Sequence, residues 1–263
     1  AAIPVLSVMG IQACPMPTAV LTSQTGFKSF YCNDCTDKLD YYTSEWKKLG
    51  FQPDGIYTGF LSSEKQVDKI LDFINSFETE NTLVLVDPVM GDGGRTYSLF
   101  TDTLACKMKK LVTVADVITP NLTECCILCD VDYCEFIKNA DKPDFLDKIA
   151  ELGKNLLNRY GVKIVIITGI EHKDIDGTMY VQNLIASKDE VFSVSCKKIG
   201  GSYSGTGDLF ASVMFSGLLR GDTLRDTVSL AVKFIETSLR DTIALGIDRN
   251  EGIEFEKHLK ILL

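Results

Sequence analysis

A short glycine-rich turn in front of an apolar helix carries the residues best suited to chemistry. Gly205, Thr206 and Gly207 precede Asp208, and an apolar helical segment follows them. Such a turn presents unpaired backbone N–H groups and the positive end of a helix dipole to an anion. A carboxylate beside that anion site can accept a proton from an alcohol while the amides hold a phosphoryl group. The turn therefore indicates phosphoryl transfer, although most isolated G-T-G-D strings are ordinary helix starts.

Oxygen-bearing and small residues also follow the predicted strands of the chain. In open α/β sheets, ligands bind at the carboxyl ends of the parallel strands, so these residues are expected to carry function. They are rich in oxygen ligands and poor in His, which favours Mg²⁺ and phosphate over zinc or acyl transfer. The set comprises Thr58, Phe60, Asp87, Thr119, Asn121, Glu124 and Thr168.

The segment "DPVMGDGGRTY" is open to two interpretations. Its glycines predict a flexible loop that carries Asp92 and Arg95. The segment is either an ordinary surface turn or a loop over a nucleotide, with Asp92 near a metal ion.

The elements that must position these residues alternate between strands and helices. "TLVLVDP" and "VKIVIITG" are continuous apolar runs, typical of strands buried on both faces. Helical spacing is found over 36–50, 62–77, 101–115 and 142–161, with Ser63 and Gln66 as a capping box. "GTMYVQN" and "EVFSVSCKK" alternate like antiparallel edge strands, and three helices are expected near 207–220, 223–243 and 251–262. This order predicts an α/β fold, a mostly parallel sheet between two helical layers.

Composition narrows the classes of protein. The 263 residues are 45% apolar and carry a net charge of −9, which argues against nucleic acid as a partner. Charges or glycines interrupt every apolar run, and the first ten residues lack the features of a signal peptide. The odd count of nine cysteines indicates reduced thiols in the cytosol. The sequence contains two C-x-x-C pairs, which are more simply interpreted as ordinary cysteines than as a zinc site. No linker or repeat is present, so residues 1–263 are expected to form one domain.

Four motifs together resemble the pyridoxal kinases of the ribokinase-like superfamily. They are "YSGTGDLFAS", "VDPVMGDGG", "ITPNLTE" and "VIITG", in the order and at the spacing of that family. "PTAVLTSQTGF" and "YTGFLSSE" match its substrate-side segments, and the resemblance runs from about residue 1 to residue 245.

The resemblance implies a kinase that phosphorylates the 5-hydroxymethyl group of pyridoxal, pyridoxine and pyridoxamine. It implies ATP, Mg²⁺, often a monovalent cation such as K⁺ or Na⁺, and a homodimer. Asp208 matches the catalytic base, the Gly205–Gly207 amides match the anion hole, and Glu124 matches a residue tied to Mg²⁺ through water. Other positions match residues around the ATP phosphates and metal (Asp87, Asp92, Thr119, Asn121, Thr168), a nucleotide loop (Tyr97) and the vitamin ring (Thr25, Phe60).

The chain departs from the family pattern at its beginning. The family starts with a strand and a glycine-containing loop, whereas this sequence starts inside the helix that follows them. About twenty residues are therefore expected to be missing, and with them a central strand of the sheet.

Other functions are compatible with parts of the pattern. Hydroxymethylpyrimidine kinases share the fold and much of the motif set, although the "GTGDLF" and "DPVMGDGG" forms favour pyridoxal. A catalytically silent vitamin- or nucleotide-binding regulator would have no need of the base, the anion hole and the metal carboxylate together. A sugar kinase is disfavoured because residues 10 to 50 are too few and too helical to form a lid of strands.

Overall fold

The computed structural model describes residues 1–98, 100–140 and 142–263, and these divide into two compact units. The first unit comprises residues 1–15, 173–182 and 194–263. The second comprises residues 16–172 and 183–193. The expectation of one domain stays a prediction.

A six-stranded sheet in the order β10-β9-β8-β7-β4-β3 is the main sheet of the described chain. Its strands β3, β4, β7 and β8 pair in parallel, with Leu85 opposite Val117 and Val117 opposite Ile164. Short turns join β8 to β9 and β9 to β10, and such short connections are possible only between antiparallel strands. The strands are β3 (Gly55–Thr58), β4 (Leu83–Val86), β7 (Val117–Ile118), β8 (Ile164–Lys173), β9 (Met179–Ser187) and β10 (Val191–Lys197).

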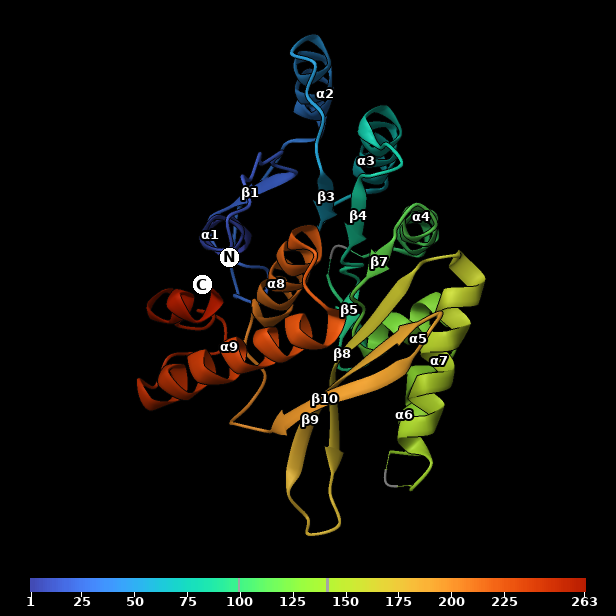
Figure 1. Cartoon of the computed structure of the whole chain (residues 1–263), viewed down its shortest axis with the longest axis vertical. Coiled ribbons are helices and arrows are strands. Elements are labelled where there is room, and N and C mark those ends of the chain that lie inside the picture. Colours follow the sequence, from blue (N-terminus) through green and yellow to red (C-terminus); the bar gives the residue numbers. More distant parts are fainter. Residues whose placement is uncertain (99, 141) are drawn as a thin grey trace. The chain divides into compact units, whose positions relative to one another are not determined.

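Helices of the second unit pack against one face of these strands. Figure 1 shows α3 and α4 beside β3, β4 and β7, and α7 beside the strands that follow. Side-chain caps at Ser63, Thr101 and Asn121 begin three of the helices, as expected where backbone N–H groups need acceptors. The helices are η1 (Thr36–Lys38), α2 (Leu39–Lys48), α3 (Glu64–Phe77), α4 (Asp102–Val112), α5 (Leu122–Cys129), α6 (Tyr133–Ile137) and α7 (Phe145–Tyr160).

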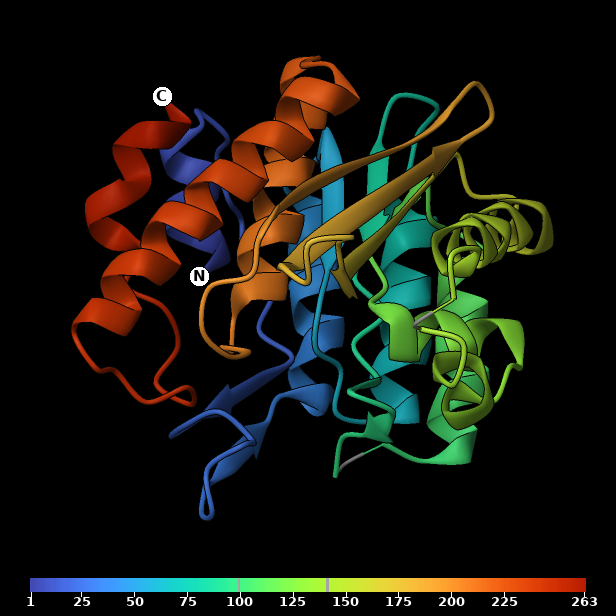
Figure 2. The ribbon, with the colours of Figure 1, turned by 90° about the horizontal axis from the view of Figure 1, so that it is seen from below.

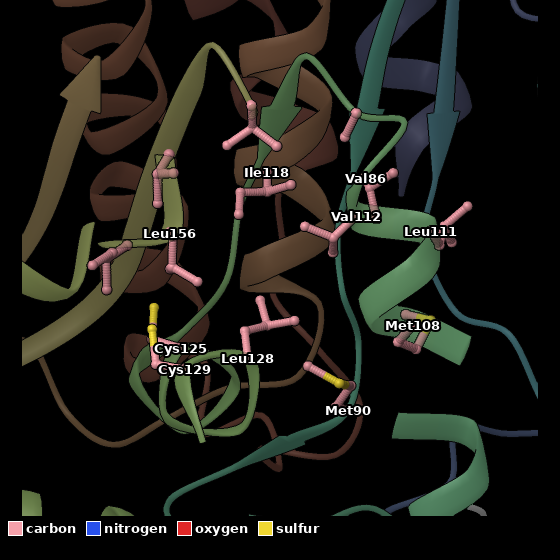
Figure 3. Close-up of a cluster of buried hydrophobic side chains, with 14 of the residues drawn as sticks. Val86, Met90, Met108, Leu111, Val112, Ile118, Cys125, Leu128, Cys129 and Leu156 are labelled. Carbon is pink, nitrogen blue, oxygen red and sulfur yellow. The ribbon is translucent and has the colours of Figure 1, made fainter. Parts of the chain in front are cut away.

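One apolar core joins those helices to the sheet. Val86 and Ile118 from the strands meet Leu111 of α4 and Leu128 of α5 in this core, and Figure 3 shows them together. Leu85, on the opposite face of β4, is also fully buried. The continuous apolar run of this strand therefore reflects burial on both faces, as predicted.

The first unit is built mainly from helices. The helix α8 (Thr206–Arg220) packs on α1 (Ala2–Val8) and on α9 (Leu224–Ala244), and η2 (Glu256–Leu262) packs on α1 and α9. Gly217 of α8 allows a close approach to α9, because a Cβ there would lie 2.4 Å from Cγ2 of Thr227. The third predicted helix is thus a shorter 3₁₀ helix that starts at Glu256 rather than at residue 251.

The α/β class, the mostly parallel sheet and its antiparallel additions are confirmed, but several local predictions are wrong. The loop after Asp87 forms a small hairpin of β5 (Gly91–Asp92) and β6 (Arg95–Thr96). The strand β9 lies inside the sheet, so its second half is continuously buried, and only β10 alternates. Residues 10–50 include a two-stranded ribbon of β1 (Ala19–Leu21) and β2 (Cys32–Asp34), shown in blue in Figure 2.

Within the described ranges, none of the helices has both the length and the apolar character needed to cross a membrane.

Candidate active site

The carboxyl ends of the parallel strands bring several predicted site residues together in the second unit. Asp87 follows β4, and its backbone N–H donates to the carbonyl of Thr58 at the end of β3. The Thr119 hydroxyl, after β7, donates to Oδ1 of Asp87 at 3.0 Å. Asn121 pairs with Thr168 of β8 in an isolated parallel bridge. These residues thus form one polar edge of the sheet, as the order of the strands requires.

Glu124 lies beside this edge and is held by the start of α5. It forms a capping box with Asn121, whose Oδ1 accepts from the Glu124 N–H at 3.0 Å. The Asn121 N–H donates to Oε2 of Glu124, and the Met90 N–H donates to Oε1, both at 2.9 Å. These two bonds take two of about four lone-pair sites, which leaves room for a further contact, such as a water.

The burial of Glu124 beside Asp87 makes this edge suited to a cation. Burial, and then the negative charge of Asp87, raise the pKa of Glu124 well above its ordinary value. A cation would relieve this repulsion between two buried carboxylates. Thr58 is buried as well, and its hydroxyl has no hydrogen-bond partner within the described part of the chain. The described residues show no cluster of three or more His, Cys, Asp or Glu side chains ready to bind a metal, so a cation here would need oxygens from ligand or water.

The hairpin of β5 and β6 is fixed to the helices beneath it. The Asn121 amide donates to the Gly91 carbonyl at 2.7 Å, and the Thr123 hydroxyl accepts from the Gly94 N–H at 2.9 Å. Gly94 has a φ of 78°, and a Cβ there would lie 2.5 Å from the ring of Tyr133. Only glycine fits this position, so the hairpin is a held element rather than a free loop.

The fixed hairpin carries two of the predicted nucleotide-side residues. Asp92 remains exposed, and its Oδ1 accepts the N–H of the adjacent Gly93 at 2.9 Å. Tyr97 is anchored through its backbone, whose N–H donates to the Met90 carbonyl, and its side chain is exposed. Both side chains are accessible to a ligand. Thr123 and Tyr133 were not predicted as site residues, because a hydroxyl and a ring that support a hairpin leave no motif in the sequence.

The predicted substrate-side residues lie on two other segments of the second unit. Thr25 belongs to the loop between β1 and β2 and is half-buried. Phe60 follows β3 and is also half-buried, and its carbonyl accepts from the Thr18 hydroxyl at 3.0 Å. The two segments are therefore connected at the base of the ribbon.

The glycine-rich turn belongs to the first unit and has the predicted geometry. Gly205 is the N-cap of α8 with a φ of 85°, a conformation that favours glycine, and no side chain caps the helix. The first N–H groups of α8, from Thr206 on, point out of the helix start as an anion site requires. The turn is supported by the chain after α9, since the Ser204 N–H donates to the Arg249 carbonyl at 3.0 Å.

Asp208 occupies the third position of α8, one residue after Gly207. Its side chain is exposed at the surface, yet desolvation by the surrounding protein raises its pKa above the ordinary value. A carboxylate with a raised pKa is a stronger proton acceptor, which suits a general base. Asp208 and the amides lie in one unit and the cation edge in the other, so the structure describes each set separately. Their joint role stays a proposal.

The mostly parallel sheet and the glycine turn at the start of α8 agree with the ribokinase-like class that the motifs indicated. A protein-family model described as phosphomethylpyrimidine kinase matches residues 3–252, and the chain belongs to this family. The resemblance to pyridoxal kinases seen in the motifs is confirmed by relatives of that type.

Three similar proteins illustrate the relationship. A provisionally named pyridoxal kinase of Schizosaccharomyces pombe is 30% identical over 208 residues, which are 76% of this chain and 57% of the relative. The chain thus spans little more than half the length of that relative. A second similar protein is a provisionally named phosphomethylpyrimidine kinase from Bacteroides thetaiotaomicron, whose structure was solved with pyridoxal. It is 38% identical with a TM-score of 0.90, and the match covers 99% of this chain and 88% of that chain. Pyridoxal kinase from Lactobacillus plantarum is 25% identical with a TM-score of 0.85, covering 100% and 90%.

The cysteines near this site are expected to be unreactive in the folded protein. Burial, followed by the neighbouring Cys129, raises the pKa of Cys126 to about 12, and burial raises that of Cys129 to about 11. A thiol with a raised pKa stays protonated and is a poor nucleophile. Iodoacetamide at about pH 8 should therefore spare the three buried cysteines of α5 and modify the exposed ones, as read by mass spectrometry of peptides. The exposed cysteines are Cys14, Cys106 and Cys134. Denatured protein should be modified at every cysteine, and rapid modification of Cys126 in folded protein would contradict the burial seen here.

Proposed function

We propose that this protein transfers the γ-phosphoryl group of ATP to the 5-hydroxymethyl group of pyridoxal, pyridoxine and pyridoxamine. The observation that carries the proposal is the pair of features described above, a glycine turn with Asp208 and an acidic sheet edge with Glu124. Support for the substrate comes from the Bacteroides thetaiotaomicron structure, which is 38% identical and contains pyridoxal. Homodimer formation in the cytosol belongs to the same proposal.

The proposed reaction assigns Asp208 as the base. Asp208 accepts the proton of the hydroxymethyl group, the alcohol oxygen forms a bond to the γ-phosphorus, and the bond between that phosphorus and the β-phosphate oxygen breaks to release ADP. The N–H groups of the Gly205–Gly207 turn donate to the oxygens of the phosphoryl group that is being transferred. Thr25 and Phe60 are assigned to the vitamin ring, as the family resemblance implies.

The acidic edge of the sheet would serve the nucleotide and its metal ion. When bound, Mg²⁺ neutralises the charge that develops on the ATP phosphates. Glu124 would hold it through water, and Asp92 would approach it from the hairpin. Asp87, Thr119, Asn121 and Thr168 line the phosphate side, where a monovalent cation would also fit among the oxygens. Tyr97 belongs to the segment that would approach the nucleotide.

Hydroxymethylpyrimidine is the alternative substrate, because the family model that matches residues 3–252 is described as phosphomethylpyrimidine kinase. Both substrates present a hydroxymethyl group on a six-membered nitrogen heterocycle, so the roles of Asp208 and Glu124 would be the same.

The deciding experiment measures ATP consumption with pyridoxal and with hydroxymethylpyrimidine side by side, at matched enzyme and Mg²⁺ concentrations. We expect the higher kcat/KM with pyridoxal. A higher kcat/KM with hydroxymethylpyrimidine would favour the alternative function. ATP binding without turnover of either alcohol would contradict both and favour a regulatory protein.

A further inference from the structure

Gln66, on the first turn of α3, is completely buried, which is uncommon for an amide side chain. Its backbone N–H donates to the hydroxyl of Ser63, as the predicted cap requires. Its side chain, however, does not return to Ser63 to complete a capping box. Its Oε1 instead accepts from the Ser62 N–H at 2.8 Å, and its Nε2 donates to the ribbon of β1 and β2.

The Gln66 amide reaches three acceptors at the base of the ribbon. Nε2 lies 2.7 Å from the Thr18 carbonyl, 3.1 Å from the Thr36 hydroxyl and 3.3 Å from Oδ2 of Asp34. The amide has two hydrogens, so the two shorter contacts take them and Asp34 shares one. The orientation of the amide is determined, because a flip would set its NH₂ group against the Ser62 N–H.

Two further bonds join the same segments. The Thr18 hydroxyl donates to the Phe60 carbonyl at 3.0 Å, and the Ser62 hydroxyl donates to Oδ2 of Asp34 at 2.8 Å. The ribbon and the Phe60–Ser62 segment therefore meet in one hydrogen-bonded network with Gln66 at its buried centre. Strands β1 and β2 have three residues each, and such a short ribbon is at most marginally stable by itself.

We propose that Gln66 is a positioning residue, which holds the ribbon loop that carries Thr25 against the segment that carries Phe60. This inference rests on the proposed function, in which those two residues contact the heterocyclic alcohol. Loss of the amide would leave the Ser62 N–H without its acceptor and the Thr18 carbonyl with the Cys35 N–H alone, so the ribbon would be held less firmly against α3. The alcohol-binding half of the site would loosen, while the nucleotide half, built on β4, β7 and α5, would be retained.

The test replaces the amide by an apolar side chain of similar length in the variant Gln66→Met. Hydrogen exchange of the ligand-free protein is expected to become faster over residues 18–36 and to stay unchanged over β4 and β7. In the kinase assay the KM for the alcohol should rise by about tenfold, while the KM for ATP changes by less than about twofold. The alcohol is the one that the wild-type protein phosphorylates, pyridoxal or hydroxymethylpyrimidine.

Two other variants keep the inference open to refutation if Gln66→Met folds poorly. Thr18→Val preserves the shape of the side chain and removes only the hydroxyl bond to Phe60, so it should raise the KM for the alcohol in the same direction and by less. Ile74→Val, a fully buried change on the same helix, removes one methyl group outside the network and should leave both KM values unchanged.

The possible results separate the two proposals. Unchanged exchange over residues 18–36 in Gln66→Met, or an equal rise of both KM values, would overturn the role of Gln66. Faster exchange with an unchanged KM for the alcohol would overturn it as well. If the wild-type protein phosphorylates neither alcohol, the proposed function fails, whereas the exchange result still decides whether Gln66 holds the ribbon.

Discussion

Replacement of Asp208 by asparagine is expected to lower kcat by about a hundredfold to ten-thousandfold, the usual contribution of a general base. The amide of asparagine cannot accept the proton of the hydroxymethyl group, whereas the backbone N–H groups of the Gly205–Gly207 turn remain in place. Affinity for ATP, measured by calorimetry with the magnesium complex, should therefore change little. The loss should appear in kcat and in kcat/KM alike, since the interaction is made in the transition state.

Asp226→Asn provides the matched control for this variant. Asp226 occupies the third position of the next helix, α9, as Asp208 does in α8, and it is also exposed. Both substitutions remove one negative charge from a helix start and weaken its interaction with the helix dipole. Asp226→Asn should keep wild-type turnover. A comparable loss of activity in both variants would assign the effect of Asp208 to helix stability rather than to catalysis.

The pH dependence gives a second readout of Asp208. Its pKa is raised above the ordinary value by desolvation. A base acts in its deprotonated form, so kcat/KM of the wild-type protein should rise with pH through that raised pKa. The residual activity of Asp208→Asn should lack this acid limb. An unchanged limb in the variant would show that another group is the base.

Glu124→Gln has the second largest expected effect, a rise of about tenfold to a hundredfold in the Mg²⁺ concentration that gives half-maximal activity. The substitution removes a buried negative charge beside Asp87. It also sets an NH₂ group where the carboxylate accepted backbone N–H groups of Met90 and Asn121. Both changes weaken an indirect contact with the metal. Mg²⁺ and ATP should raise the melting temperature of the wild-type protein more than that of the variant, because ligand binding stabilises the folded state in proportion to affinity.

Asp116→Asn is the control for Glu124→Gln. Asp116 also accepts a backbone N–H, that of Val84 at 2.8 Å, and also pairs with a neighbour, Lys163. It precedes β7, however, at the amino end of the strand and away from the polar edge. Its replacement should lower stability without changing the Mg²⁺ requirement. An unchanged Mg²⁺ requirement in Glu124→Gln would show that Glu124 does not contribute to the metal site.

The sequence predicted much of the architecture because strong local signals agreed with the tertiary environment. The apolar run of β4 requires burial on both faces, and Leu85 and Val86 are both fully buried. Gly205 before Asp208 predicted a turn and a helix start, and both are present. Helix ends at Gly10, Gly50 and Gly161 have the positive φ that such glycines favour.

Where prediction failed, contacts with another segment of the chain overrode the local pattern. Ser63 and Gln66 have the spacing of a capping box, yet the Gln66 amide binds the ribbon 48 residues earlier in the chain. The glycines after Asp87 predicted a free loop, but Asn121 and Thr123 hold them in a hairpin. Alternation in "GTMYVQN" predicted an edge strand, but β10 pairs with β9 and buries it.

The sequence by itself determined the alternation of strands and helices, the glycine turn with Asp208 and the residues that the motifs share with pyridoxal kinases. Spacing, apolar periodicity and glycine placement act over a few residues and are therefore visible in the order of amino acids. Only the tertiary structure decided that Glu124 lies buried beside Asp87, that Thr123 and Tyr133 support the hairpin, and that Gln66 ties the ribbon to α3. Burial and hydrogen bonding between distant segments depend on how the chain packs, and no local pattern encodes which buried donor meets which acceptor.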